Sequence, residues 1–317
     1  MSPQLKGEQL TRGGRAGLRR LNEYIFRPRN VAVVSPHLAS RLLNEVKDSG
    51  GSTSLRVRVT LDLGLTYVDG VIEGDSLVVG DLRVSLSNLR QVASSTAVHA
   101  VLEGGEVLEP VQLYDGALRR FYKLRAVGEA EAPTLEINGI HMHRIKETTP
   151  WRDTLAKVRA LGRLKGAKVL DICTGLGYTA IAALRRGAKE VMSIEADENV
   201  LRVAEINPWS RDLSRVRIIV GDAAEVVSEF PEDSFTHIIH DPPRFQTAGH
   251  LYSTEFYTEL LRILKPGGKL FHYVGEPGRK KGRSYVGGVK GRLVKAGFII
   301  LKWDPLALGF VAVKPYT

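Results

Sequence analysis

One short segment, residues 168–184, constrains this chain more than any other. An apolar run, Lys168–Ile172, has the length of a buried strand and leads directly into a turn that contains Gly175 and Gly177. A helical pattern of apolar residues begins after the second glycine. Glycine is needed in such a turn where a side chain would block the close approach of a ligand to the backbone. The segment therefore predicts a parallel sheet with a ligand at one edge.

Strands and helices alternate through the rest of the second half of the chain. A helix is predicted over Trp151–Leu164, ahead of the strand Lys168–Ile172. Six more strands follow at regular spacing: Val191–Glu195, Val216–Val220, His237–His240, Lys269–Val274, Phe298–Trp303 and Phe310–Lys314. Alternation of this kind produces a mostly parallel sheet with helices on both faces. We therefore expect an α/β fold with a seven-stranded sheet.

The first half of the chain has a different texture, with short strands and frequent turn residues. Residues 55–61 alternate polar and apolar side chains with the period of a half-buried strand, and one helix is predicted over 36–47. We expect a small, mainly β domain over residues 31–148 and the α/β domain over 149–317. Residues 1–30 carry seven basic and two acidic side chains and are predicted to form a flexible basic arm.

Acidic residues mark the ends of three predicted strands in the second half. Asp171 lies at the end of the first strand, Glu195 ends the second, and Asp222 follows the third. In nucleotide-binding sheets, an acid at the end of the second strand accepts hydrogen bonds from ribose hydroxyls. We therefore predict that Glu195 holds a ribose and that Asp222 receives an adenine amine. A glycine turn alone is common to many nucleotide-binding folds, so the surrounding motifs decide the kind of cofactor.

Four motifs resemble the ordered motifs of class I S-adenosylmethionine-dependent methyltransferases: DICTGLGYT (171–179), IEAD (194–197), GDA (221–223) and DPPRF (241–245). The resemblance implies the Rossmann-like methyltransferase fold and S-adenosylmethionine as cofactor. It implies that the cofactor-binding residues are Asp171, Thr174, Gly175, Gly177, Tyr178, Glu195, Ala196, Asp222, Ala223 and Asp241. Asp171 would face the amino group of the methionine part, with both glycines beneath it. The main alternative is a nicotinamide-dependent dehydrogenase, but the turn lacks the third glycine of the dinucleotide motif.

The fourth strand ends in Asp241-Pro242-Pro243, which resembles the Asn/Asp-Pro-Pro-aromatic motif of methyltransferases acting on exocyclic amines. The lone pair of a base amine is delocalised into the ring, which makes the nitrogen a poor nucleophile. A carboxylate and a proline carbonyl can accept the amine hydrogens, and two prolines fix the backbone in advance. A proline pair can also simply end a strand. We predict Asp241, Pro242, Pro243 and Phe245 as the catalytic residues.

This reactive corner, residues 241–245, departs from the motif at its fourth position, where Arg244 replaces the expected aromatic residue. Either Phe245 stacks on the base from a shifted position, or Arg244 stacks through its guanidinium plane. Similar strings occur in enzymes that methylate carbon 5 of pyrimidines in RNA, and those enzymes need a catalytic cysteine. The one cysteine of the chain, Cys173, lies inside the glycine turn, which disfavours that route.

A turn is predicted over residues 264–268, ahead of the fifth strand of the second half, and a basic, glycine-rich segment, residues 275–292, follows that strand. It contains six basic residues and six glycines against a single acid, so we expect a mobile loop. A basic loop that carries an aromatic residue suits a phosphate backbone and an unstacked base, and a solvated connection is the alternative. The predicted substrate-binding residues are Arg244, Arg279, Lys280, Lys281, Arg283 and Tyr285.

The composition favours a polyanionic partner inside the cell. The net charge is +10, with 45 Lys and Arg against 35 Asp and Glu, and nucleic acid is the leading polyanion. Ion-pair networks in a thermophile are the alternative, and scarce Cys and Met fit such a source. We expect no membrane partner and a cytoplasmic location, because no stretch resembles a membrane span or a signal peptide. His141 and His143 alone are too few for a metal site, so none is predicted.

Both halves of the chain resemble one archaeal methyltransferase family. The likeness lies in VTLDLGLT (59–66), PTLEINGIHMHRIKETTPW (133–151) and the stretch from His240 to Gly278. It implies methyl transfer to the 4-amino group of a cytidine in small-subunit ribosomal RNA, with that RNA or a subunit assembly intermediate as partner. Three alternatives stay open: a small-amine (polyamine-like) methyl- or aminopropyltransferase, a ribosomal-protein methyltransferase, and a non-enzymatic RNA-binding factor. The oligomeric state is left open.

Overall fold

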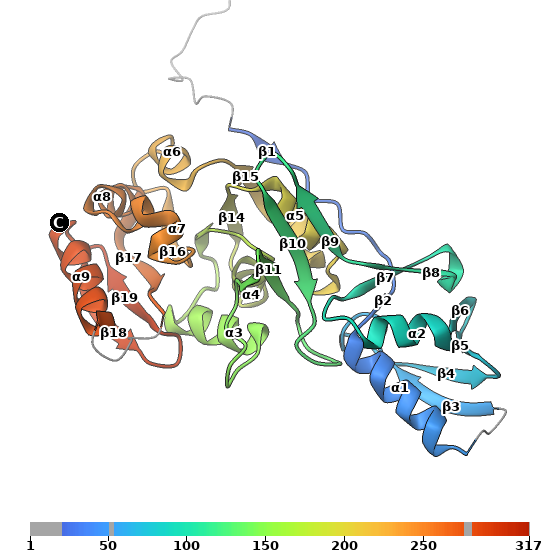
Figure 1. Cartoon of the computed structure of the whole chain (residues 1–317). Coiled ribbons are helices and arrows are strands. Elements are labelled where there is room, and N and C mark those ends of the chain that lie inside the picture. Colours follow the sequence, from blue (N-terminus) through green and yellow to red (C-terminus); the bar gives the residue numbers. More distant parts are fainter. Residues whose placement is uncertain (1–20, 51–53, 276–280, 317) are drawn as a thin grey trace, which may run out of the picture.

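The computed structural model describes residues 21–50, 54–275 and 281–316, and the side chains of all of these except 281–284. Its largest element is a sheet to which these ranges contribute eight strands (Figure 1). In spatial order the strands are β1 (Glu23–Tyr24), β15 (Arg217–Val220), β14 (Glu190–Glu195), β13 (Lys168–Ile172), β16 (Phe235–His240), β17 (Leu264–Tyr273), β19 (Gly309–Val313) and β18 (Ile299–Asp304).

The centre of this sheet is parallel, as the alternation of strands and helices predicts. β13 pairs in parallel with β14 on one side and with β16 on the other, and β15 and β17 continue the parallel part outward. β17, β19 and β18 pair antiparallel at the far edge. All seven predicted strands are present, and the predicted α/β fold is confirmed.

The eighth strand, β1, lies in the segment predicted as a flexible arm. It pairs antiparallel with β15, so the sheet has one strand more than predicted. The contact is held beyond the ladder, because the Tyr24 hydroxyl and the backbone N–H of Arg27 both donate to the Glu205 carboxylate. Phe26 beside it is buried. Residues 21–30 are thus fixed along the α/β domain, while residues 1–20 lie outside the described ranges.

Helices cover both faces of the sheet (Figure 1). On one face lie α3 (Pro150–Ala160), α4 (Tyr178–Arg185), α5 (Glu198–Ile206) and η2 (Pro208–Arg215). On the other lie α6 (Ala223–Ser228), α8 (Thr254–Ile263) and α9 (Lys281–Lys295), with α7 (Phe245–Ala248) and η3 (Gly249–Tyr252) leading from β16 to α8. Successive strand residues supply the two cores, since Val169 packs with the first group and Leu170 with the second.

Two predicted loops are regular structure instead. The prediction of a mobile loop over residues 275–292 is wrong for its described part, because α9 begins at Lys281. Val289 and Leu293 are fully buried in the second core, and this packing offsets the poor helix propensity of the glycines. Residues 264–268, predicted as a turn, form the first half of β17, where the pairing with β16 shifts register.

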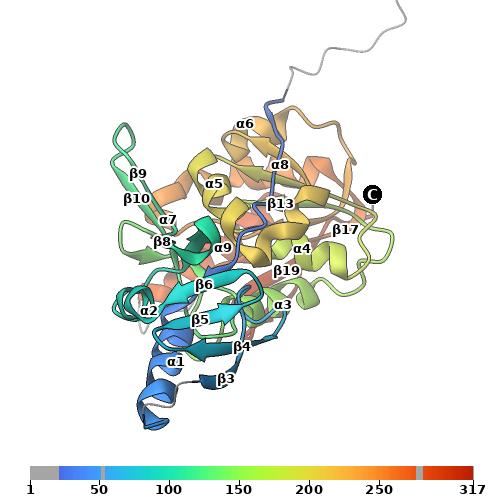
Figure 2. The ribbon, with the colours of Figure 1, turned by 90° about the vertical axis from the view of Figure 1, so that its right-hand side faces the viewer.

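The N-terminal half consists of small antiparallel sheets and two longer helices (Figure 2). One sheet contains β3 (Ser54–Val59), β4 (Val68–Glu73), β5 (Ser76–Val79) and β6 (Leu82–Ser85). The others contain β2 (Val33–Val34), β7 (His99–Leu102) and β8 (Val107–Pro110), and β9 (Gln112–Asp115), β10 (Arg120–Arg125), β11 (Thr134–Ile137) and β12 (Ile140–His141). The helices are α1 (Pro36–Asp48), α2 (Leu86–Ala93) and the short η1 (Glu103–Gly105). α1 matches the helix predicted over residues 36–47.

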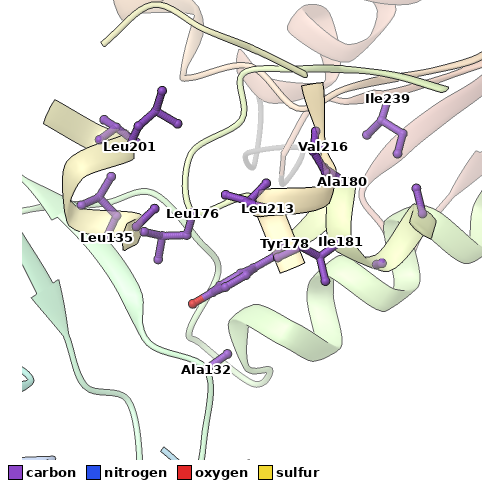
Figure 3. Close-up of a cluster of buried hydrophobic side chains, with 14 of the residues drawn as sticks. Ala132, Leu135, Leu176, Tyr178, Ala180, Ile181, Leu201, Leu213, Val216 and Ile239 are labelled. Atoms are coloured by element: carbon purple, nitrogen blue, oxygen red, sulfur yellow. The ribbon is translucent and has the colours of Figure 1, made fainter. Parts of the chain in front are cut away.

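A shared core joins the two halves (Figure 3). Tyr178, the first residue of α4, points its ring into this core, and its hydroxyl donates to the backbone carbonyl of Pro133 at 2.9 Å. Leu176 from the glycine turn and Leu135 from β11 are buried in the same cluster. The turn that carries the glycines is therefore braced by residues from the N-terminal half.

Candidate active site

Four acidic residues lie at one edge of the large sheet. Asp171 lies near the end of β13, Glu195 ends β14, Asp222 follows β15 and Asp241 follows β16. The four strands are parallel neighbours, so their carboxyl ends open on the same side, where ligands bind in open α/β sheets. The fold thus brings the predicted cofactor residues next to the reactive corner.

Glycine is required at the two positions of the turn for different structural reasons. Gly175 has a φ of +54°, and a Cβ added there would meet nothing within 4 Å, so its backbone borders open space. Gly177 has a φ of +77°, and a Cβ there would overlap the side chain of Leu213. Open space beside the backbone is what a close-lying ligand needs, whereas the second glycine is required by packing of α4 against η2.

Glu195 is fixed next to that open space. Its two carboxylate oxygens accept hydrogen bonds from the backbone N–H groups of Gly175, at 2.9 Å, and Asp197, at 3.1 Å. Burial raises the pKa of Glu195, and these N–H groups oppose the shift. Each oxygen keeps a second lone pair, so the carboxylate can still accept from a pair of hydroxyls. Ala196 follows directly in the chain.

Asp171 is completely buried and receives only neutral donors. The hydroxyls of Thr179 and Ser193 donate to its two oxygens at 2.7 and 2.8 Å, and Thr174 bonds to Ser193 in turn. Burial raises the pKa of Asp171 to about 7, against the effect of both hydroxyls. The carboxyl therefore stands at the base of the site with no countercharge in direct contact among the described side chains.

Asp222 forms the start of α6, ahead of Ala223. Its Oδ1 accepts the backbone N–H of Ala224 at 2.8 Å, and its Oδ2 lies 2.9 Å from Nε2 of His250. Both side chains are substantially exposed. The sequence motif indicates Asp222 but not His250, because the contact is made across 28 positions and depends on the path of η3.

The Tyr178 side chain lies away from this edge. Its ring is in the core between the two halves, where Asn207 Nδ2 also donates to its hydroxyl at 2.9 Å (Figure 3). The ring of His143 packs against it, with centroids 5.1 Å apart. Tyr178 thus braces the turn from behind, and its side chain does not line the open space next to Gly175.

The carboxylate of Asp241 is paired with a buried lysine. Lys157 Nζ donates to Asp241 Oδ2 at 2.7 Å and contacts Asp153 Oδ2 at 3.0 Å. Asp153 Oδ1 accepts a hydrogen bond from Arg144 Nη1 at 2.7 Å. The Lys157 ammonium also lies over the ring of Tyr273, 4.1 Å from its centroid. We call Arg144, Asp153, Lys157 and Asp241 the ion chain.

Burial is the largest influence on both ends of the Lys157–Asp241 contact. It raises the pKa of Asp241, and the adjacent ammonium acts in the opposite direction. It lowers the pKa of Lys157, but attraction to Asp241 and Asp153 outweighs burial and the net shift is upward. The lysine is therefore charged throughout the physiological range and compensates the carboxylate.

Sequence reasoning missed the two members of the ion chain on α3, although a signal exists. Asp153 and Lys157 are four residues apart, so they share one face of the helix. That face is the buried one, while Arg152 and Arg159 on the opposite side are exposed. Charged side chains on the apolar face of an amphipathic helix are uncommon and indicate a buried ion pair or a functional site.

Aromatic residues surround the rest of the reactive corner. The Tyr252 hydroxyl donates to the Pro243 carbonyl at 2.8 Å, which fixes the end of the proline pair. Phe245 is 44% exposed, and its ring meets those of Tyr252 and Tyr285 edge-on, at centroid distances of 5.6 and 5.9 Å. Arg244 is exposed just before α7. In the sequence, Arg244 and Phe245 follow Asp241 by three and four positions.

The predicted substrate-binding residues divide into two groups. Tyr285 reaches the reactive corner, as its contact with Phe245 shows. Arg279 and Lys280 lie outside the described residues, and so do the side chains of Lys281 and Arg283 in the first turn of α9. Only Arg244 and Tyr285 of this set are therefore placed by the described side chains.

Cys173 is in a conformation that glycine usually adopts, with a φ of +70°. Burial raises the pKa of its thiol well above the ordinary value, and the nearby carboxyls of Glu195 and Asp241 add to the shift. A thiol in this state is a poor nucleophile, because the thiolate is the reactive form. The geometry gives no support to a cysteine-dependent attack on a pyrimidine ring.

The described ranges contain no group of three or more His, Cys, Asp or Glu side chains arranged to hold a metal ion. His141 Nε2 lies 3.1 Å from Glu136, and His143 Nδ1 lies 3.1 Å from the Thr134 hydroxyl. Within the same ranges, no helix has the length and apolar character needed to cross a bilayer.

A cavity of about 540 Å³ opens in the N-terminal half, away from these strand ends. Its walls come from the start of α1, the end of α2 and the end of β10, and they include Pro36, His37, Ser40, Thr96, Arg125 and Ile145. None of the predicted site residues lines it. The chemistry-bearing side chains of the sheet edge are therefore independent of this cavity.

Known proteins resemble the two halves to different extents. The family model described as "Methyltransferase domain" matches residues 169–268. The uncharacterised protein MJ1233 of Methanocaldococcus jannaschii is 50% identical over 288 residues, a match that covers 88% of this chain and 96% of that protein. The polyamine aminopropyltransferase of Mycobacterium tuberculosis is 33% identical over 119 residues, or 34% of this chain and 23% of that protein.

Among solved structures, a spermidine synthase in complex with the transition-state analogue AdoDATO has a TM-score of 0.50. It is 20% identical and covers 63% of this chain and 71% of its own. At that identity the likeness shows the fold alone. Open space at Gly175 and the carboxylates of Glu195 and Asp222 together provide the room and the hydrogen-bond acceptors that ribose hydroxyls and an adenine amine require.

Proposed function

This chain belongs to the protein family of MJ1233 and is an S-adenosylmethionine-dependent methyltransferase by its domain, and we propose that it methylates an exocyclic base amine in RNA. The predicted class of enzyme and its cofactor are confirmed. The proposed acceptor is the 4-amino group of a cytidine in small-subunit ribosomal RNA, which the enzyme would meet in the cytoplasm as free RNA or as an assembly intermediate.

We assign the cofactor residues by their geometry. Glu195 accepts the ribose hydroxyls, and Asp222, with Ala223 beside it, receives the adenine. Gly175 lets the methionine part lie against the backbone, and Asp171 supports its amino group from below, through Thr174 and Ser193. When bound, S-adenosylmethionine supplies an electrophilic methyl group on a sulfonium. The residues of the sheet edge hold that group still and facing the reactive corner.

The acceptor nitrogen is aimed by the reactive corner. Asp241 and the Pro242 carbonyl accept the two amine hydrogens, which directs the nitrogen lone pair at the methyl carbon. With S-adenosylmethionine bound, the nitrogen–carbon bond would form as the sulfur–carbon bond broke, and the bonding electron pair would stay on sulfur. The surplus proton then leaves the nitrogen through Asp241 to solvent. Phe245 or Arg244 stacks on the base and keeps it in place.

This proposal rests on one observation. The carboxylate of Asp241, whose backbone is fixed by the two prolines that follow it, lies at the sheet edge next to the carboxylates assigned to the cofactor. Lys157 holds the Asp241 side chain, and Tyr252 holds the Pro243 carbonyl, so the geometry exists before substrate binds. Such preorganisation is what a weak nucleophile needs. The net charge of +10 supports a polyanion as the molecule that carries the amine.

A small amine such as a polyamine is the second candidate acceptor. The local match to an aminopropyltransferase favours it. A ribosomal-protein methyltransferase and a non-enzymatic RNA-binding factor lack a specific observation of this kind. Intact carboxylates at all four strand ends argue for an enzyme.

Mass spectrometry of nucleosides from purified small-subunit ribosomal RNA tests the proposal, with RNA from cells that have or lack the gene. We expect a cytidine methylated on its exocyclic nitrogen in the first sample and its loss in the second. An identical set of modified nucleosides would contradict the assignment to RNA. A methyl group missing only from digests of ribosomal proteins would favour the protein substrate instead.

A further inference from the structure

The ion chain balances its own charge. Its two cations and two anions alternate, and the three successive contacts measure 2.7, 3.0 and 2.7 Å. Lys157 and Asp153 are 5% and 2% exposed, so both are charges removed from water. A buried charge is tolerated only when it is paired. The protein therefore neutralises Asp241 with its own lysine before any substrate binds.

Lys157 also makes the two oxygens of Asp241 unequal. Its Nζ occupies Oδ2, and within the described ranges no other donor contacts this carboxylate. The side chain of Asp241 keeps 20% exposure. Oδ1 is thus the oxygen left for an incoming hydrogen-bond donor, and the lysine sets the direction in which it points.

We infer, resting on the proposed function, that Lys157 is the positioning and specificity-determining residue of the acceptor site. Its ammonium favours the ionised form of Asp241 and leaves one oxygen free, and it thereby selects a neutral amine over a cationic one. A base amine needs a hydrogen-bond acceptor and brings no charge. A polyamine would bring its charge to a carboxylate that is already paired, where the Lys157 ammonium repels it.

The groups that face Asp241 come from every element packed against it. They are Asp153 and Lys157 on α3, Asp171 on β13, Cys173 in the glycine turn, Tyr273 on β17 and Tyr252 on η3. Arg144, before α3, pairs with Asp153. Lys157 is the cation in direct contact among the described side chains. Without it, burial and the neighbouring acids all favour the protonated carboxyl, which cannot accept the amine hydrogen in the same way.

A lysine that serves only as a structural strut would leave the pH dependence of the reaction unchanged, so the pH profile separates the two roles. The variants are Lys157→Met, Lys157→Arg and, as a matched control, Lys168→Met, whose exposed lysine contacts Glu190. The measurement is kcat/KM for methyl transfer to small-subunit ribosomal RNA from cells that lack the gene, between pH 5 and 9.

Lys157→Met should lose at least about tenfold at pH 7 and regain activity as the pH rises, because Asp241 then ionises only at higher pH. The acidic limb of its profile of kcat/KM against pH should move to higher pH by about one unit or more, since a pKa shift of one unit corresponds to a tenfold change in the ionisation equilibrium. Lys157→Arg keeps a cation and should restore the wild-type limb, and Lys168→Met should match the wild type. An unmoved limb in Lys157→Met would overturn the inference.

A second measurement does not depend on the reaction. Thermal unfolding of Lys157→Met, Asp241→Asn and the double variant, without cofactor or RNA, forms a double-mutant cycle. Lys157→Met should lower Tm by about 10 °C at pH 8, and much of the loss should disappear at pH 5, where Asp241 takes a proton. The double variant should recover most of the loss. Additive losses would overturn the coupling. A coupled cycle with no RNA methylation would instead contradict the proposed function alone.

Spermidine serves as the cationic probe. Wild-type enzyme is given isotope-labelled S-adenosylmethionine and either RNA or spermidine at equal amine concentration. It should label the RNA at least about 100-fold faster, which reflects stronger stabilisation of the transition state for the neutral amine. Comparable labelling of spermidine would overturn the selection of a neutral amine.

Discussion

Two groups of carboxylates stand at the carboxyl ends of the parallel strands and are stabilised in opposite ways: Asp171 and Glu195, which we call the cofactor edge, and Asp241, which we call the acceptor edge. Asp171 and Glu195 accept hydrogen bonds from neutral hydroxyls and backbone N–H groups. Asp241, at the end of the strand next to β13, is paired with the ammonium of Lys157. Burial raises the pKa of all three, but within the described part of the chain a cation directly contacts Asp241 alone.

The difference matches what each edge receives. S-adenosylmethionine brings a sulfonium, an ammonium and two hydroxyls, so carboxylates without countercharge are complementary to it. A base amine brings two hydrogens and no charge, so a compensated carboxylate is sufficient. Under the proposed function, the sheet offers uncompensated acids to a positively charged cofactor and a compensated acid to a neutral acceptor. Five substitutions, described in four predictions, test this contrast.

The largest expected effect is at the acceptor edge. Asp241→Asn keeps the shape of the side chain but replaces one acceptor oxygen with a donor, so kcat should fall by about 10² to 10⁴. The affinity for S-adenosylmethionine should change by no more than about threefold, as isothermal titration calorimetry can show. Near-normal kcat would remove Asp241 from the mechanism, and a collapse of cofactor affinity would erase the contrast between the edges.

The second effect is on stability at the cofactor edge. The folded protein keeps the Asp171 proton up to a pH of about 7, whereas the unfolded chain releases it near its ordinary pKa of 3.8. Stability therefore falls as the pH rises from about 4 to 7, by as much as about 4 kcal/mol for a three-unit shift.

Asp171→Asn removes this titration, so it should melt higher than wild type at pH 8 and show a much smaller difference at pH 4. Melting without cofactor, followed by circular dichroism at both pH values, measures it. A constant difference between the two proteins across the range would mean that Asp171 is not the titrating group.

The third effect separates binding from chemistry. Glu195→Ala removes a carboxylate that receives hydroxyls, and one or two charge-assisted hydrogen bonds correspond to a 10- to 100-fold rise in Kd, roughly. kcat at saturating cofactor should stay within a fewfold of wild type. Glu190→Ala on the same strand is the control, because its side chain is exposed and, among the described side chains, it forms an ion pair with Lys168 alone. Loss of kcat with unchanged Kd would contradict the assignment.

The smallest effect distinguishes the two glycines. Gly177→Ala should lower stability by about 2 kcal/mol, because a Cβ overlaps Leu213 and φ is positive. Gly175→Ala meets no neighbouring atom, so its cost in stability should be smaller and its main effect should be a weaker cofactor affinity. Urea unfolding and calorimetry on both variants test this. Unchanged cofactor affinity in Gly175→Ala would show that the open space beside Gly175 has no role in binding, and equal losses in stability would contradict the difference in packing.

Much of the α/β domain was predictable because its signals are local. Alternating apolar runs predict the strands, and the acids at their ends follow from the parallel arrangement, which brings Asp171 and Glu195 to one edge. Pairing of β1 with β15 was not predictable, since a two-residue strand has no periodicity and depends on a distant acid, Glu205. α9 was missed because buried Val289 and Leu293 outweigh the glycines only once the second core has formed.

In the candidate site too, the features that depend on local sequence could be predicted, and those that depend on distant contacts could not. The carboxylates could be found from motifs, but their partners could not, because Lys157 meets Asp241 across 84 positions of sequence. The placement of Tyr178 illustrates the converse: a residue inside a motif can point into the core, where its hydroxyl reaches Pro133, 45 positions away. Motifs indicate which backbone borders a ligand, whereas the direction of each side chain depends on tertiary packing.

The identity of the methylated atom tests the central claim most directly. Purified enzyme, isotope-labelled S-adenosylmethionine and small-subunit ribosomal RNA from cells that lack the gene are allowed to react, and the RNA is digested to nucleosides for mass spectrometry. The account predicts the label on the exocyclic nitrogen of a cytidine, and its absence with Asp241→Asn. Label on a ribose oxygen or a ring carbon, or no labelled nucleoside at all, would contradict it.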